Sequence, residues 1–117
     1  RLDRVCARLP DLLPQDEAPA LLHGDLWGGN QTTDGRGRPW IYDPASFYGC
    51  READLAFTRL FGGFPAAFYG AYEAEFPLAP GFADRVDLWN LYPLLVHANL
   101  FGGGYGRQVD GIARRYL

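Results

Sequence analysis

The sequence contains no lysine, because all eleven of its basic residues are arginine. A chain without lysine cannot carry a Walker A lysine, a Schiff-base lysine or the nucleotide-binding lysine found in the small lobe of a kinase. If this chain takes part in phosphate chemistry, that lysine is therefore absent or is supplied by another part of a longer protein.

The chain also has few cysteines and a small net charge. Cys6 and Cys50 are the only cysteines, and their wide separation fits neither a CxxC motif nor a disulfide framework, so we expect two reduced thiols. The formal net charge is −3, which is the wrong sign for a nucleic-acid-binding surface. We therefore expect no nucleic-acid partner.

Long apolar runs and a leader sequence are missing as well. The longest uncharged stretch, residues 88–106, is interrupted by Pro93, polar residues and four glycines, so we expect no membrane helix. The first residues do not have the pattern of a signal peptide. The chain opens on Arg1 within a helical pattern, and we expect it to be a fragment of a longer protein.

The composition is that of one globular domain, with 117 residues of which 48% are hydrophobic and 15% aromatic. The spacing of apolar residues predicts a fold that is α+β but mostly α. The long helix is predicted to kink at Pro93, and Pro10 is predicted to stop the first helix, whose apolar face includes Cys6. The predicted helices are residues 1–9, 52–61, 65–76, 82–101 and 108–116, and the predicted strands are residues 20–22 and a hairpin of 31–33 with 39–42.

The most informative segment is residues 23–30, which read HGDLWGGN and follow a short apolar strand. The spacing H-x-D-x-x-x-x-N, followed by a hairpin that ends in Asp43, is the spacing of kinase catalytic loops. Phosphoryl transfer needs a carboxylate beside the attacking hydroxyl and oxygen ligands for Mg²⁺. We therefore predict Asp25 as the catalytic base, Asn30 and Asp43 as the Mg²⁺ ligands, and His23 as a brace that holds the loop by hydrogen bonding.

Taken singly, each of these residues could be an ordinary turn residue beside glycine or proline. Their combination, after an apolar strand and with the spacing of a hairpin, favours phosphotransfer. Only ten residues separate Asp43 from Asp54, which leaves no room for the long activation segment of a regulated protein kinase. The sequence therefore favours a small-molecule kinase.

Several segments together resemble the fructosamine kinase (ketosamine kinase) family, which is grouped with the aminoglycoside phosphotransferases in a kinase-like superfamily. The loop motif alone would mark the superfamily, whereas Trp27 within it and DPASFYG at residues 43–49 point to the fructosamine branch. The resemblance covers nearly the whole chain, through residues 23–30, 41–49, 51–56, 61–65, 79–82 and 97–102.

The resemblance implies that residues 1–117 are the C-terminal, helical catalytic lobe of a kinase-like fold, in which a small β-hairpin carries the catalytic loop. It implies ATP and Mg²⁺ as cofactors and a ketoamine, free or protein-bound, whose sugar hydroxyl is phosphorylated in protein deglycation. Asp25 aligns with the family's catalytic aspartate, and Asn30 and Asp43 align with its metal ligands. The family's N-terminal nucleotide lobe is missing, so we expect negligible activity from these residues alone, and we expect the parent enzyme to be cytoplasmic.

Four further residues have two interpretations each. Asp54 resembles the aspartate that supports the catalytic loop, or it is a common acidic residue at a helix start. Trp27 and His97 contact the acceptor substrate or pack in the core. Arg51 meets a phosphate or pairs with Glu52 or Asp54.

Three other functions stay open at this point. An aminoglycoside- or choline-type phosphotransferase would share the loop motif but not the fructosamine-branch residues. A non-catalytic kinase-like lobe would belong to a parent that lacks the nucleotide lysine. A metal-dependent hydrolase built on His23, Asp25 and Asp43 would need more metal ligands than the sequence offers, since His97 is the only other histidine.

Overall fold

The computed structural model describes all residues, 1–117, and is mostly helical, as predicted, with two small sheets where one hairpin was expected. The helices are α1 (Leu2–Leu12), α2 (Glu52–Leu60), α3 (Ala66–Glu75), α4 (Phe82–Trp89), α5 (Leu91–Phe101) and α6 (Tyr105–Arg115). The strands are β1 (Ala20–Leu22), β2 (Gln31–Thr33), β3 (Pro39–Ile41) and β4 (Phe47–Gly49), and a 3₁₀ turn covers Gly28–Asn30.

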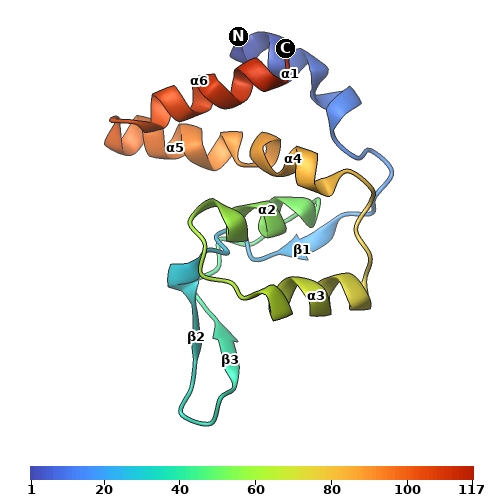
Figure 1. Ribbon diagram of the computed structural model, residues 1–117, viewed down its shortest axis with the longest axis vertical. Helices are drawn as coiled ribbons and strands as arrows, with labels where there is room; N and C mark the ends of the chain where they lie inside the picture. Colours follow the sequence, from blue (N-terminus) through green and yellow to red (C-terminus); the bar gives the residue numbers. More distant parts are fainter.

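The elements are stacked along the long axis of a molecule that measures 48 × 35 × 24 Å (Figure 1). Helices α1 and α6 form one end, α4 and α5 lie below them nearly in line, and α2 and α3 follow. The β2–β3 hairpin projects from the other end, beyond the 3₁₀ turn. The chain is therefore extended, with a helical end and a β end.

Two separate apolar clusters hold the helices together. The larger one joins α1, α4, α5 and α6, and its buried members are Val5, Leu88, Leu91, Leu94, Val109, Ile112 and Ala113. The smaller one joins α2 to α4 through Leu55, Ala56 and Phe82, with α3 packed against it through Phe68 and Tyr72. Burial of apolar side chains is the main force that docks these helices.

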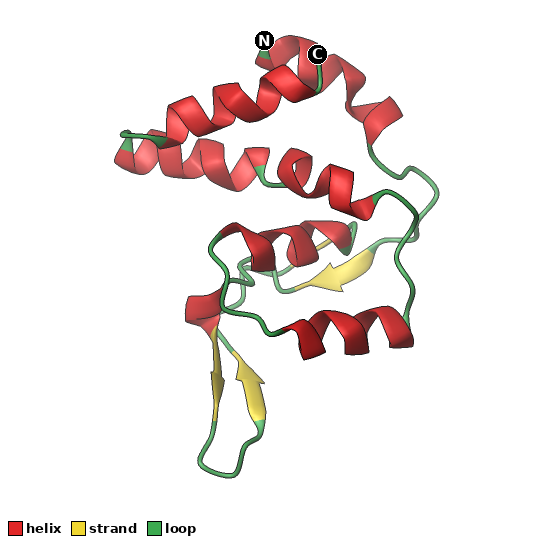
Figure 2. Ribbon diagram, in the orientation of Figure 1, coloured by secondary structure: helices red, strands yellow, loops and turns green.

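The strands form two separate two-stranded antiparallel sheets (Figure 2). β2 pairs with β3 as the predicted hairpin, around the turn 34–37. β1 pairs with β4, with Leu21 opposite Tyr48, and this second pairing was not predicted. The predicted catalytic loop therefore lies between β1 and β2, and joins one sheet to the other instead of belonging to the hairpin itself.

Three helix boundaries differ from the prediction. The helix expected over 82–101 is two helices that meet at Asn90, because the ring of Pro93 cannot coexist with a helical carbonyl at Trp89 four residues earlier. Helix α1 passes through Pro10 and ends at Leu12, where the N–H of Leu13 caps the carbonyl of Leu9 at 2.9 Å. Helix α6 begins at Tyr105, not at residue 108.

The expected apolar face of α1 also needs one correction. Val5 is buried in the larger cluster and Leu2 and Leu9 pack against it, but Cys6 is exposed. Cys6 and Cys50 are both free thiols. No helix of the structure is both long enough and apolar enough to span a membrane.

A buried ion pair joins α2 to α4. The side chain of Glu52 is fully buried and accepts hydrogen bonds from Nε and Nη2 of Arg85 at 2.9 and 2.7 Å, and from Nε1 of Trp89 at 2.8 Å. Burial alone would raise the pKa of Glu52, but the hydrogen bonds and the charge of Arg85 outweigh it and lower that pKa below the ordinary value of 4.5. Glu52 is therefore a charged group inside the junction between the helices.

Candidate active site

The predicted catalytic loop, residues 23–30, is held at its start by a carboxylate from α2. Asp54 accepts the backbone N–H of His23 at 2.7 Å and the backbone N–H of Gly24 at 3.0 Å, one on each oxygen. Gly24 has φ +84°, a conformation that side chains rarely adopt. The loop therefore leaves β1 through a tight turn whose two N–H groups are held by one side chain.

Gly24 also lies close to the chain that returns from the hairpin. A Cβ atom at this position would meet the carbonyl oxygen of Ala45 at 2.0 Å. We expect Gly24→Ala to lower the free energy of unfolding by about 2 kcal/mol, because the left-handed conformation and the contact both become strained. Urea denaturation of the variant measures this loss, and Gly35→Ala, where a Cβ meets nothing within 4 Å, is the matched control. Equal stability of the two variants would contradict the prediction.

Asp25 and Asn30 are in direct contact across the loop. Nδ2 of Asn30 donates to the backbone oxygen of Asp25 at 2.9 Å and to its carboxylate Oδ2 at 3.0 Å. Asn30 is buried and Asp25 is half-buried. Both side-chain hydrogen bonds of Asn30 leave from its nitrogen, so its oxygen Oδ1 keeps its lone pairs free of protein donors.

Asp43 is held beside this loop by the residues around it. The N–H of Tyr42 donates to the carbonyl of Asn30 at 3.1 Å, and its hydroxyl donates to the carbonyl of Gly29 at 3.0 Å. Two residues after Asp43, the N–H of Ala45 donates to the carbonyl of His23 at 2.8 Å. Asp43 lies between these anchors, is exposed, and has φ +52°, the one non-glycine residue in the left-handed region. Asp is one of the few side chains that adopt this conformation readily.

The ring of His23 is fully occupied by hydrogen bonds within the protein. The backbone N–H of Asp25 donates to Nδ1 at 3.2 Å, so the proton lies on Nε2, which donates to the carbonyl of Tyr42 at 2.8 Å. His23 thus joins the catalytic loop to the segment that carries Asp43. It has no free nitrogen with which to bind a metal or move a proton.

The atoms that these site residues leave free to coordinate a metal are all oxygens. They are Oδ1 of Asn30, the carboxylate of Asp43, which accepts no hydrogen bond from the protein, and the second oxygen of Asp25. Such a donor set suits Mg²⁺, which prefers oxygen and commonly takes one or two protein ligands beside phosphates and waters. No group of three or more His, Cys, Asp or Glu side chains is arranged to hold a metal. The residues present therefore fit Mg²⁺ carried with a nucleotide better than a cage made by the protein alone.

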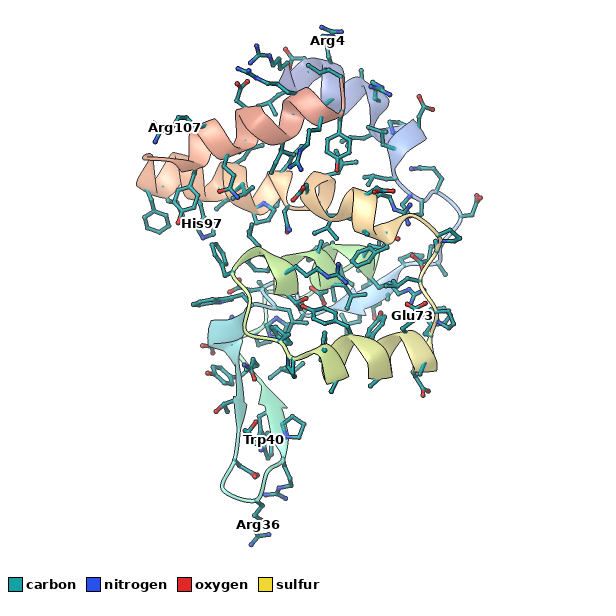
Figure 3. The ribbon with its side chains drawn as sticks, viewed as in Figure 1. Arg4, Arg36, Trp40, Glu73, His97 and Arg107 are labelled. Atoms are coloured by element: carbon teal, nitrogen blue, oxygen red, sulfur yellow. The ribbon has the colours of Figure 1, made fainter.

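Trp27 and His97 are connected through the ring of Phe61. The indole of Trp27 meets the ring of Phe61 edge-on, with centroids 6.1 Å apart, and Phe61 in turn lies 5.2 Å from His97. Figure 3 shows His97 extending from α5 toward the end of α2. Its Nδ1 donates to the carbonyl of Pro93 at 2.7 Å. Neither residue belongs to an apolar cluster of the core, and Trp27 is 39% exposed.

Arg51 is not part of the loop. Its guanidinium pairs with Glu17 at 2.5 Å, and not with Glu52 or Asp54, and it donates to the carbonyls of Phe76 and Pro77 at 2.7 Å each. It is buried, so it is not available to a phosphate. A cavity of about 460 Å³ between α2 and α3 contains none of the predicted site residues, and its lining includes Arg59 and Tyr69.

Two contributors to the site were missed by sequence reasoning. One is the pair of backbone anchors at Tyr42 and Ala45, for which a sequence carries no signal. The other is the segment 61–63, which carries part of the family resemblance in sequence but was given no role at the site. In the structure this segment touches the loop, and a Cβ on Gly28 would meet the carbonyl of Gly62 at 2.8 Å. The signal that could have found it is a pair of glycines on each side of the contact, at 28–29 and 62–63.

Comparison with known proteins gives a consistent result. A family model described as fructosamine kinase matches residues 1–117. The chain is 55% identical over 98 residues to the probable ketoamine kinase of Lactiplantibacillus plantarum, a match that covers 84% of this chain and 35% of that protein. It is 52% identical over 99 residues to the ketosamine-3-kinase of Mus musculus, which covers 84% of this chain and 32% of that protein.

Solved structures agree with the sequence comparisons. The crystal structure of a candidate fructosamine-3-kinase from Thermobifida fusca YX-ER1 superposes with a TM-score of 0.89 at 41% identity, over 99% of this chain and 40% of that one. The chain thus spans about a third of the length of the curated relatives it matches. Because the family model covers every residue, the chain belongs to the fructosamine kinase family.

Proposed function

We propose that this chain is the C-terminal catalytic lobe of a kinase that uses ATP and Mg²⁺ to phosphorylate a sugar hydroxyl of ketoamines, free or bound to protein, and so acts in deglycation. The observation that carries the proposal is that Asn30 is hydrogen-bonded to Asp25 and that the segment carrying Asp43 is hydrogen-bonded to the backbone of Asn30. Asn30 binds Asp25 directly, and Tyr42, next to Asp43, binds the backbone of Asn30. The names of the relatives supply the substrate class.

The residues divide the work as follows. Asp25 is half-buried and held by Asn30, so its carboxylate can accept the proton of the attacking hydroxyl and orient that oxygen. Asn30 and Asp43 would hold Mg²⁺ through oxygen. When bound, the metal neutralises the charge that develops on the phosphates. Asp54 and His23 keep the loop in place, and Trp27, whose indole N–H donates to no protein atom, is free to contact the acceptor.

The remaining part of such a kinase would be an N-terminal lobe, joined to this one in the same parent protein. The relatives are about three times longer than the matched region, and the chain has no lysine with which to hold the nucleotide. We therefore expect the 117 residues alone to be inactive and the parent, which we place in the cytoplasm, to be active.

A metal-dependent hydrolase is disfavoured by the state of His23, because both ring nitrogens are already engaged by the protein. An aminoglycoside- or choline-type phosphotransferase would use the same loop and differ in its acceptor. A non-catalytic lobe would not need Asp25 and Asn30 to be held together beside the segment that carries Asp43. The ketoamine kinase is thus the function that the site supports best.

The test is ATP consumption by the parent protein with Mg²⁺ and fructosyl-lysine or ribulosyl-lysine as acceptor. Turnover of a ketoamine is expected. Turnover of an aminoglycoside or of choline in its place would keep the fold and overturn the substrate. Absence of both turnover and Mg²⁺-dependent nucleotide binding would support the non-catalytic lobe.

The role of Asn30 can be tested through the metal. We expect Asn30→Ala to raise the Mg²⁺ concentration needed for half-maximal activity about 10- to 100-fold, because a ligand oxygen is lost. Titration of Mg²⁺ at saturating ATP measures this change. Asn99→Ala, an exposed asparagine on α5, is the control and should not alter the requirement. A Mg²⁺ requirement equal to that of the wild type would contradict the assignment of Asn30 as a ligand.

A further inference from the structure

The end of α2 makes two independent contacts with the catalytic loop. The first is between backbones, since Gly62 and Gly63, with φ +72° and +101°, turn the chain against Gly28, and a Cβ on Gly63 would meet the Cα of Gly28 at 3.1 Å. Nε2 of Gln31 donates to the carbonyl of Gly63 at 3.3 Å, which extends the contact past the loop. The second contact is between side chains, through Phe61.

Phe61 touches rings from three different elements. Its centroid lies 6.1 Å from Trp27 in the catalytic loop, 6.0 Å from Phe57 on α2 and 5.2 Å from His97 on α5. The interplanar angles with Trp27 and Phe57 are 76° and 71°, the edge-to-face arrangement that aromatic pairs prefer. His97 in turn contacts Tyr105 on α6, at 5.3 Å. Phe61 therefore connects the loop to the helical end of the molecule.

The indole of Trp27 contacts the backbone of its own loop and the ring of Phe61. A Cβ on Gly29 would meet the ring of Trp27 at 2.2 Å, so the ring lies folded back over the backbone of its own loop. Phe61 adds an edge-to-face contact to the same ring, with centroids 6.1 Å apart. If Phe61 were truncated, the ring could swing away from the loop while the hydrogen bonds of Asp25 and Asn30 stayed intact.

Phe61 is not a core residue. It is 44% exposed and belongs to neither apolar cluster. A large, half-exposed ring that packs mainly on other half-exposed rings contributes less to stability than to the orientation of its neighbours.

We propose that Phe61 is a positioning residue of the active site, which fixes the orientation of Trp27 for the acceptor substrate. The inference rests on the proposed function for its kinetic consequence, and on the structure alone for the orientation of Trp27. A purely structural role would predict a loss of stability without a selective change in substrate binding.

The experiment uses the parent protein with Phe61→Ala, the ring-preserving Phe61→Tyr, and the control Phe101→Ala. Phe101 is also an exposed aromatic residue and contacts His97, at 5.7 Å, but has no contact with the loop. We expect Phe61→Ala to raise the KM for the ketoamine about tenfold, while the KM for ATP changes less than about twofold. Phe61→Tyr and Phe101→Ala should behave as the wild type.

A second measurement follows Trp27 directly. In protein labelled with fluorotryptophan, the fluorine resonance of Trp27 is identified by its loss in Trp27→Phe, and it should shift or broaden in Phe61→Ala but not in Phe101→Ala. An unchanged resonance, or equal changes in both KM values together with a lower thermal midpoint, would overturn the inference. If the wild-type parent turns over no ketoamine, the proposed function fails, whereas the fluorine spectra still decide whether Phe61 positions Trp27.

Discussion

Replacing Asp25 with asparagine is expected to lower the kcat of the parent kinase about 10²- to 10⁴-fold, the usual contribution of a general base. The change keeps the size of the side chain and its contact with Asn30, but the amide can no longer take the proton of the acceptor hydroxyl. The KM for ATP should change little, because Asp25 faces the acceptor in the proposed arrangement. Steady-state kinetics with a ketoamine acceptor measure both parameters.

The control for this variant is Asp16→Asn, an exposed acidic residue in the loop that precedes β1. It should leave kcat and KM unchanged. A kcat for Asp25→Asn within a few-fold of the wild type, with the fold retained, would remove Asp25 from the chemistry. The proposed mechanism would then lose its base.

The largest effect on stability is expected at Glu52. Removing its side chain leaves the guanidinium of Arg85 and the indole N–H of Trp89 without their main partner inside the α2–α4 junction. Breaking a buried ion pair in this way costs about 3–5 kcal/mol, because a charge stays buried and uncompensated. We expect Glu52→Ala to lower the free energy of unfolding by this amount, measured by urea denaturation of the parent.

The exposed pair of Arg114 and Asp110 gives the comparison. Both side chains are largely open to solvent, at 63% and 40% exposure, so Arg114→Ala should cost less than about 1 kcal/mol. Similar losses of unfolding free energy in Glu52→Ala and Arg114→Ala would show that burial does not strengthen the ion pair of Glu52 with Arg85. The two variants therefore separate a buried charge from a surface charge on the same fold.

The Glu52 pair also predicts a pH dependence. The pKa of Glu52 in the folded protein lies below the ordinary value of 4.5, so its carboxylate stabilises the fold fully above pH 4.5. That stabilisation is lost as the pH falls through the lower, folded-state pKa. The difference in unfolding free energy between wild type and Glu52→Gln should therefore narrow on acidification below about pH 4.5. If the difference in unfolding free energy between wild type and Glu52→Gln does not change with pH, the stabilisation does not come from the charge of Glu52.

The sequence predicted the helices and the hairpin because these depend on local spacing. The apolar period marks α2, and the turn between β2 and β3 is marked by glycines. It did not predict β4, because a strand of only three residues carries little local signal. Its partner strand, β1, also lies far away in the chain. The long helix was expected to kink at Pro93 but is broken at Asn90, and whether a proline kinks or breaks a helix depends on how the flanking helices pack.

The candidate site divides in a similar way. Asp25, Asn30 and Asp43 could be proposed from spacing, because phosphoryl transfer requires these side-chain types and kinase catalytic loops space them in this way. The contacts of Phe61 and the actual partner of Arg51 could not, because both are set by packing between segments that are distant in the sequence. Spacing along a chain thus suggests candidate reactive groups, and tertiary structure decides which other groups hold them.

The anchor at residue 45 has a consequence for which sequences can build this site. Ala45 contributes to the site through its backbone N–H, which binds the carbonyl of His23, and its exposed side chain adds nothing to that bond. Most amino acids could therefore stand at position 45, whereas proline, which has no N–H, could not. Position 24 is the opposite case, because there any side chain would collide with the carbonyl of that same residue 45. Two facing positions of one contact thus differ in the range of substitutions they permit, one being nearly free and the other limited to glycine.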